Sequence, residues 1–133
     1  MPRMLLLLAL LAFAGCDSGT NQPAFAELHP VRGTVMRGGK PVAGGAVQFA
    51  AAPEDGSFMI NSDVLPDGTF QLSTVRTTDT QGERKTGAPA GSYRVTYMPV
   101  VVDQTAGNVE PITLNKEVTV EAKDNDLTIE LPR

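Results

Sequence analysis

Residues 31–50, VRGTVMRGGKPVAGGAVQFA, predict the fold of this chain more clearly than any other stretch. Apolar or small residues alternate with polar or larger ones over 31–36, and the alternation returns over 47–51. Successive side chains of a β-strand point to opposite faces, so each run predicts a strand with one face in the core. The Gly38-Gly39 pair between the runs tolerates the positive φ of a tight turn, and Pro41 limits where the next strand can begin.

The same period of two recurs along the chain, weakly over 57–62 and then over 70–73, 93–98, 117–121 and 127–131. On these strands we expect Val47 and Ile129 to face the core, and Gln48 and Thr128 to face solvent. The chain has 13 glycines and 10 prolines, and no amphipathic helix is predicted after residue 16. We therefore predict an all-β fold, a single Greek-key β-sandwich of about seven short antiparallel strands over residues 30–133.

Four stretches resemble carboxypeptidase-regulatory-like domains, which are relatives of the transthyretin or prealbumin-like sandwich. They are VRGTVMRGGKPVAGGAVQFA at 31–50, LPDGTFQL at 65–72, GAPAGSYRVTYMP at 87–99 and VTVEAKDNDLTIEL at 118–131. The resemblance implies a transthyretin-like arrangement in which the last stretch is a closing hairpin. Its motifs are turn glycines and core aromatics, so it implies a fold and no particular activity.

The N-terminus has a positively charged start followed by an uncharged apolar run from Met4 to Ala14. Such a run is too short to span a bilayer and is typical of a signal peptide. Phe13-Ala14-Gly15-Cys16 resembles the bacterial lipobox, which implies a lipoprotein signal peptide over 1–15 and lipidation of Cys16. The small and polar residues that follow predict a flexible tether over 16–29. We therefore expect export to the cell envelope and attachment through lipidated Cys16, with the choice of membrane left open.

Composition argues against several function classes. The chain carries 11 Lys and Arg against 15 Asp and Glu, whereas nucleic-acid binding needs a concentrated basic face. The one cysteine is assigned to lipidation and the one histidine, His29, precedes the first strand, so we expect no metal site and no cofactor. The resemblance brings in two enzyme groups, hydroxyisourate hydrolases and intradiol dioxygenases, but both use histidines that this chain lacks. We predict no catalytic residues and a non-enzymatic interaction or structural module.

Two other function classes stay open at this point. A carbohydrate-binding or adhesion module would present Tyr93 or Tyr97 on an exposed sheet face, where the ring could stack on a sugar. A small hydrolase of the transthyretin-like fold would bring His29 against acidic and hydroxyl groups.

Two polar connections, 76–90 and 99–111, are longer than a sandwich requires, and long surface loops often carry binding residues. The residues predicted to take part are Arg84, Lys85, Val100 and Val102. The charged pair would attract an acidic partner and the valines would form an exposed apolar patch, with an unknown envelope protein or a glycan as partner. The alternatives are a solvated loop for the first connection and a continuation of the 93–98 strand for the valines.

Overall fold

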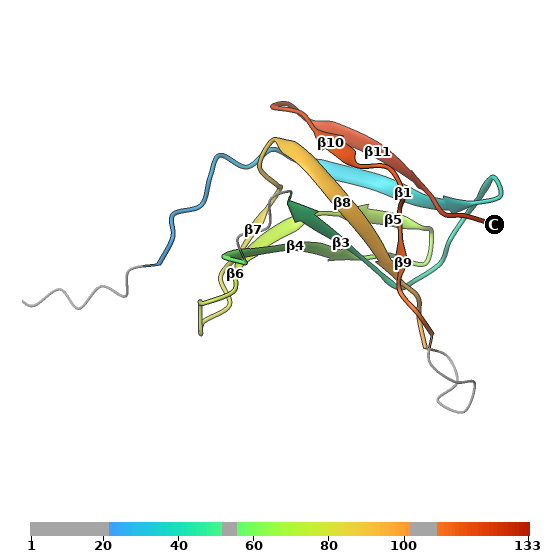
Figure 1. The fold of residues 1–133 in the computed structure, drawn as a ribbon, viewed down its shortest axis with the longest axis horizontal. Helices are drawn as coiled ribbons and strands as arrows, with labels where there is room; N and C mark the ends of the chain where they lie inside the picture. The colour runs from blue at the N-terminus through green and yellow to red at the C-terminus, as the bar shows by residue number, and fades with distance from the viewer. Residues whose placement is uncertain (1–21, 52–55, 102–108) are drawn as a thin grey trace, which may run out of the picture.

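The computed structural model describes residues 22–51, 56–101 and 109–133, and within these ranges the chain forms eleven strands and no helix (Figure 1). Accordingly, this part of the chain contains no helix long and apolar enough to cross a membrane. The smaller of two sheets contains β1 (Val31–Arg37), β2 (Lys40–Pro41), β5 (Thr69–Gln71) and β11 (Asn125–Glu130). The larger sheet contains β3 (Ala46–Ala51), β4 (Phe58–Asp63), β6 (Ser73–Arg76), β7 (Arg84–Thr86), β8 (Gly91–Met98), β9 (Ile112–Thr113) and β10 (Val118–Val120).

The two sheets form a sandwich-like arrangement, so the all-β prediction is confirmed, whereas the expected number of strands was too low. The weak alternation at 57–62 is a full strand, β4. The short strands β2, β7 and β9 were not expected, because two or three residues are too few to show a period of two.

The run at 70–73, predicted as one strand, is divided between the two sheets. β5 pairs with β1 in the smaller sheet, and β6 pairs with β4 in the larger. Leu72 lies at the crossing and is fully buried. Its backbone N–H donates to the Val31 carbonyl at 2.8 Å, and its carbonyl accepts from the Gly87 N–H at 2.8 Å. The chain therefore passes from one sheet to the other without leaving a backbone group of Leu72 unpaired.

The prediction of purely antiparallel strands is wrong for the smaller sheet. β1 pairs with β11 in parallel, with Val31 opposite Asn125 and Val35 opposite Ile129. On its other side β1 pairs with β5 antiparallel. Side-chain alternation is the same in either direction, so it could not reveal this pairing.

The stretch at 118–131 was expected to be a closing hairpin, and the structure contradicts this as well. β10 pairs with β8 in the larger sheet, while β11 pairs with β1 in the smaller. Asn125, which is buried, holds the turn between them. Its Nδ2 donates to the carbonyls of Lys123 at 2.7 Å, Glu121 at 3.0 Å and Pro30 at 3.3 Å, and its Oδ1 accepts from the Glu121 N–H at 2.9 Å. One side chain thus shapes the turn and ties it to the residue before β1.

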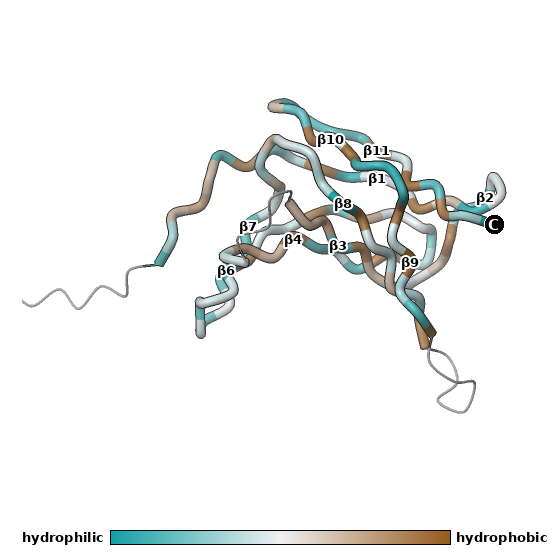
Figure 2. Tube along the Cα trace, in the orientation of Figure 1, coloured by the Kyte–Doolittle hydropathy of each residue, from teal (hydrophilic) through white to brown (hydrophobic). Residues whose placement is uncertain are grey.

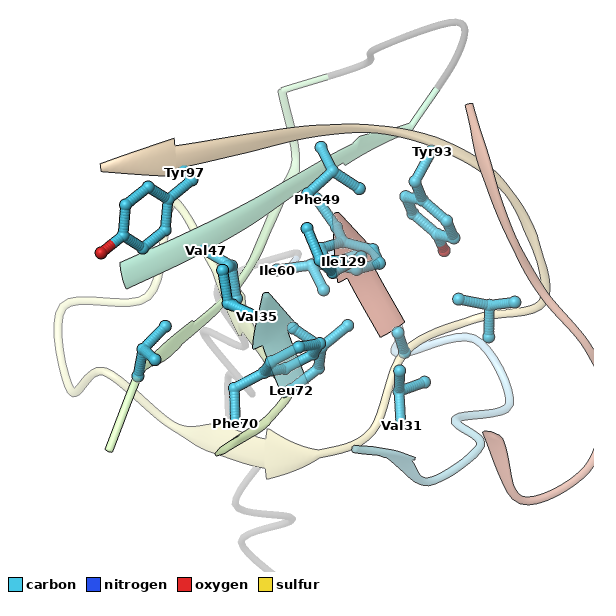
Figure 3. Packing of buried hydrophobic residues seen from close by; sticks show 14 of the residues in the cluster. Val31, Val35, Val47, Phe49, Ile60, Phe70, Leu72, Tyr93, Tyr97 and Ile129 are labelled. Atoms are coloured by element: carbon cyan, nitrogen blue, oxygen red, sulfur yellow. The ribbon is translucent and has the colours of Figure 1, made fainter. Parts of the chain in front are cut away.

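The core lies between the sheets and takes side chains from both (Figure 3). Val47 and Ile129 are 0% and 1% exposed, whereas Thr128 is exposed and Gln48 is partly buried, so the predicted alternation is confirmed. Apolar and polar residues alternate along the trace in Figure 2 in the same way. The Phe49 ring lies at the centre, with its centroid 6.3 Å from that of Phe70 and 5.9 Å from that of Tyr93. The tilted Phe49–Phe70 contact joins the two sheets, whereas the Phe49–Tyr93 contact lies within the larger sheet.

Gly33 leaves the space that lets β11 and β5 lie on either side of β1. A Cβ added at Gly33 would collide with the Leu127 carbonyl oxygen and would lie 2.7 Å from Cζ of Phe70. We expect Gly33→Ala to lower the free energy of unfolding by about 1–3 kcal/mol, because overpacking forces neighbouring groups to shift. Urea unfolding measures this change, with exposed Arg32→Ala as the control. Equal unfolding midpoints for the two variants would contradict the close approach at Gly33.

Candidate functional site

The connection at 76–90 is largely a hairpin, so the prediction of a long irregular loop is wrong. β7 folds back along β6, with Thr74 opposite Lys85. Asp79 organises the turn, because its carboxylate accepts from the N–H groups of Gln81 at 2.8 Å and Glu83 at 3.3 Å. Gly82 supplies the positive φ of 66° that follows. Asp-to-backbone bonds and a glycine are turn-forming features that the polar composition concealed.

Arg84 and Lys85, the predicted charged pair, are adjacent residues of β7 with different contacts. Neighbours on a strand point to opposite faces. Arg84 donates from Nη1 to Oδ1 of Asn61 at 2.8 Å. Lys85 lies 3.9 Å from a carboxylate oxygen of Glu83 and places Nζ 4.6 Å from the centroid of the Phe25 ring. Each cation therefore has its own neighbours within the chain.

Phe25 was not among the predicted residues, yet it occupies a defined site on the larger sheet. Its ring centroid lies 5.5 Å from that of Phe58, at an interplanar angle of 44°. Cζ of Arg76 lies 4.1 Å from the centroid of the Phe25 ring. Both Arg76 and Lys85 are therefore within cation–π range of this ring. We call this site, formed by Phe58, Arg76 and Lys85, the Phe25 slot. The sequence signal was a single aromatic residue within the small and polar segment DSGTNQPAFAELH.

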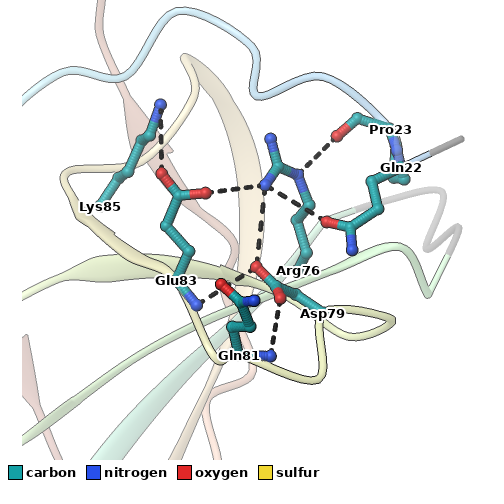
Figure 4. A network of polar contacts seen from close by, with 7 residues as sticks. All are labelled: Gln22, Pro23, Arg76, Asp79, Gln81, Glu83 and Lys85. Atoms are coloured by element: carbon teal, nitrogen blue, oxygen red, sulfur yellow. Dashed lines mark hydrogen bonds and ion pairs between the residues drawn. The ribbon is translucent and has the colours of Figure 1, made fainter. Parts of the chain in front are cut away.

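Arg76 is the centre of a polar network that also holds the backbone beside Phe25 (Figure 4). Its Nε donates to the Pro23 carbonyl at 2.7 Å, and its Nη1 donates to Oε1 of Gln22 at 3.5 Å. The same Nη1 contacts Glu83 at 3.0 Å and Asp79 at 3.8 Å. Only 16% of the Arg76 side chain is exposed, whereas Glu83 is half exposed, so the network extends from a largely buried guanidinium to the surface.

The backbone of His29 is hydrogen-bonded to the body of the domain. Its N–H donates to the Ala88 carbonyl at 2.9 Å, and its carbonyl accepts from the Ala88 N–H at 3.0 Å. Gly87, with a φ of 107°, allows this approach, because a Cβ there would lie 2.7 Å from the His29 carbonyl oxygen. Across residues 22–51, 56–101 and 109–133, no three His, Cys, Asp or Glu side chains gather as a metal site would require.

The predicted valine patch begins just after the end of β8. Val100 and Val101 are 49% and 56% exposed, and β8 ends before them at Met98, so they do not continue that strand. Val102 lies outside the described residues. Leu65 is 54% exposed and its carbonyl accepts from the N–H of Gly44, the residue whose added Cβ would lie 2.7 Å from Cγ2 of Val100. We call Leu65, Met98, Val100 and Val101 the apolar end.

β7 and the end of β8 lie far apart along the long axis of the molecule (Figure 1). The structure therefore does not bring Arg84 and Lys85 together with Val100. Cys16 and residues 1–15 lie outside the described residues.

Tyr93 and Tyr97 are core residues, each 3% exposed. Their hydroxyls donate to the carbonyls of Pro89 at 2.6 Å and Gly44 at 2.8 Å. Burial raises the pKa of both phenols above the ordinary value. Neither ring is available as a stacking platform for a sugar.

No protein-family model matches the chain, and no curated protein or solved structure is significantly similar to it. The arguments about its function therefore rest on its own residues.

Proposed function

We propose that this chain is a membrane-tethered, non-enzymatic lipoprotein of the cell envelope whose β-sandwich is an interaction or structural module. The observation that carries the proposal is Cys16, the single cysteine, which directly follows the apolar run from Met4 to Ala14 and one glycine. Acyl chains contribute about 0.8 kcal/mol per buried CH₂, so two or three chains on Cys16 would anchor the chain stably.

The finer fold assignment is part of the same proposal. We infer a relation to the carboxypeptidase-regulatory-like, transthyretin-like domains from the turn motifs of the sequence. In support, Gly38 and Gly39 have positive φ at the turn between β1 and β2. Asp67 accepts from the N–H and hydroxyl of Thr69, at 3.0 and 2.6 Å, where β5 begins, and these bonds lower the pKa of Asp67.

The apolar end is the surface that best fits a partner protein in this proposal. Four partly or largely exposed apolar side chains lie there, and the missing side chains of Gly44 and Gly45 let the chain around Met98 and Val100 approach closely. Clustered exposed apolar side chains are typical of interfaces, whereas singly scattered ones are ordinary. The proposed partner is an envelope protein with a complementary apolar surface.

We expect Cys16→Ser to abolish acyl attachment while the domain stays folded, because Cys16 precedes every described strand. Metabolic labelling with a fatty-acid analogue measures attachment, and thermal unfolding followed by circular dichroism measures folding. Equal label on the wild type and on Cys16→Ser would overturn the lipoprotein proposal.

The partner surface is tested by crosslinking in native envelopes. Val100→Ser combined with Val101→Ser should reduce capture of a partner, because it removes apolar area without altering the buried core. Thr128→Ser, on the exposed face of β11, is the matched control. Capture that is unchanged in the double variant would exclude the apolar end.

A further inference from the structure

Residues 22–29 contact the domain at two places before β1 begins. At one end Phe25 lies in the Phe25 slot, and at the other His29 forms two backbone hydrogen bonds with Ala88. Composition alone assigned this segment to a flexible tether. Its contacts are those of a docked segment, and we call residues 22–29 the strap.

The Phe25 slot has the features of a binding site for an aromatic side chain on an extended segment. Phe58 provides an apolar ring on which Phe25 packs, and Arg76 and Lys85 each place a cation near the Phe25 ring. Arg76 also binds the Pro23 carbonyl, so ring and backbone are recognised together. Glu83 lies between the two cations, 3.0 Å from Arg76 and 3.9 Å from Lys85.

We propose that the Phe25 slot is the docking site for the chain's own N-terminal segment, and that this docking holds the domain close to its lipid anchor in one orientation. The proposal rests on the lipoprotein function proposed above, because the anchor is Cys16. The segment that occupies the Phe25 slot is thus the strap of the same chain. Without docking, the strap would be part of a long linker.

The number of residues between Cys16 and the first fixed residue limits how far the domain can lie from its anchor. Gln22 is six residues from Cys16 in the sequence, so the docked end of the strap lies within about 20 Å of the anchor at about 3.5 Å per residue. With the strap released, the first fixed residue is Pro30, 14 residues from Cys16, and the limit rises to about 50 Å. Docking therefore more than halves the reach of the domain.

Docking also decides which surface faces the membrane. The Phe25 slot is built from β4, β6 and β7, whereas the apolar end follows β8 and lies apart from β7 (Figure 1). A domain anchored through the strap thus keeps β6 and β7 on the side of the domain nearest the anchor. The apolar end is apart from the docked strap, so an envelope partner can reach it while the strap is bound.

The docking is tested by a distance measurement between two spin labels. Ala24→Cys on the strap and Thr128→Cys on β11 are both exposed positions, and the natural sequence has only one cysteine, Cys16. In the full-length processed protein we expect a narrow distribution of distances between the labels. Phe25→Ser should broaden it about two-fold, because a released segment of this length samples many conformations.

Two further variants keep the test decisive. Phe25→Tyr retains the ring and should keep the narrow distribution, while Glu27→Ser changes an exposed strap residue and should also keep it. Thermal unfolding shows that each variant is folded. Equal widths for the wild type and folded Phe25→Ser would overturn the proposal.

The height above the membrane is measured by energy transfer from a dye on Thr128→Cys to a lipid-headgroup acceptor in liposomes. We expect Phe25→Ser to lower the transfer efficiency, and unchanged transfer would overturn the orienting role. Fatty-acid labelling of the same samples reports separately on Cys16. Absent label with a narrow distance distribution would refute the lipoprotein function, whereas full label with equal widths would refute the docking.

Discussion

Ile129→Asp should unfold the domain. Ile129 is 1% exposed in β11 and lies opposite Val35 in the smaller sheet, at the centre of the core. A carboxylate there has no partner and no water, and the apolar contacts of isoleucine are lost as well. We expect a loss of at least about 4 kcal/mol, which is close to the whole stability of a marginal domain of about 5–15 kcal/mol. Circular dichroism and urea unfolding measure the loss.

Thr128→Asp is the matched control for this substitution. It introduces the same side chain one residue earlier, on the exposed face of the same strand. We expect a change within about 0.5 kcal/mol, as for most surface substitutions. A similar loss in both variants would mean that the register of β11 against β1 is wrong.

Asn125→Asp should cause the second-largest loss, about 2–4 kcal/mol at neutral pH. The Asn125 amide donates to three carbonyls, and an ionised carboxylate would direct negative charge at all three. The remaining bond, from the Glu121 N–H, is one that a carboxylate can still accept. The two side chains differ little in size, so the loss measures hydrogen bonding and not packing.

The loss in Asn125→Asp should depend on pH. The carbonyls disfavour the charged form, so the pKa of the introduced carboxyl is raised in the folded state above its unfolded value of about 3.9. The folded state then binds more protons, and stability is highest below the unfolded pKa and falls as pH rises through the folded one. Glu121 and Lys123 are nearby but exposed and paired with each other. Asp126→Asn, the reverse change at the exposed neighbour, should show no comparable loss, and equal effects would contradict the role of Asn125.

Much of the core could be predicted because alternation is a local property. Val47, Ile129 and Leu72 are buried as their positions in the apolar runs indicate. The turn at Gly38 and Gly39 could be predicted as well, since glycine adopts positive φ without steric cost.

Pairing and docking could not be predicted, because they depend on residues far apart in sequence. Nothing local distinguishes a parallel β1–β11 pair from an antiparallel one, and nothing local divides 70–73 between two sheets. β7 reads Arg-Lys-Thr with all three residues exposed, so it has no apolar face to reveal it. The Phe25 slot combines side chains from three separate strands, and only the folded chain brings them together around Phe25.

The position of β1 between β5 and β11 has a consequence for biosynthesis. Asn125 bonds to Pro30 across a separation of 95 residues, so the first strand of the domain needs the last one. A growing chain presents β1 long before its parallel neighbour exists, and closing so long a loop costs entropy before the pairing offsets it. The smaller sheet can be completed only when β11 has left the ribosome. Folding of this domain is thus a late event in its synthesis, and removal of the last strand would leave the first without its parallel neighbour.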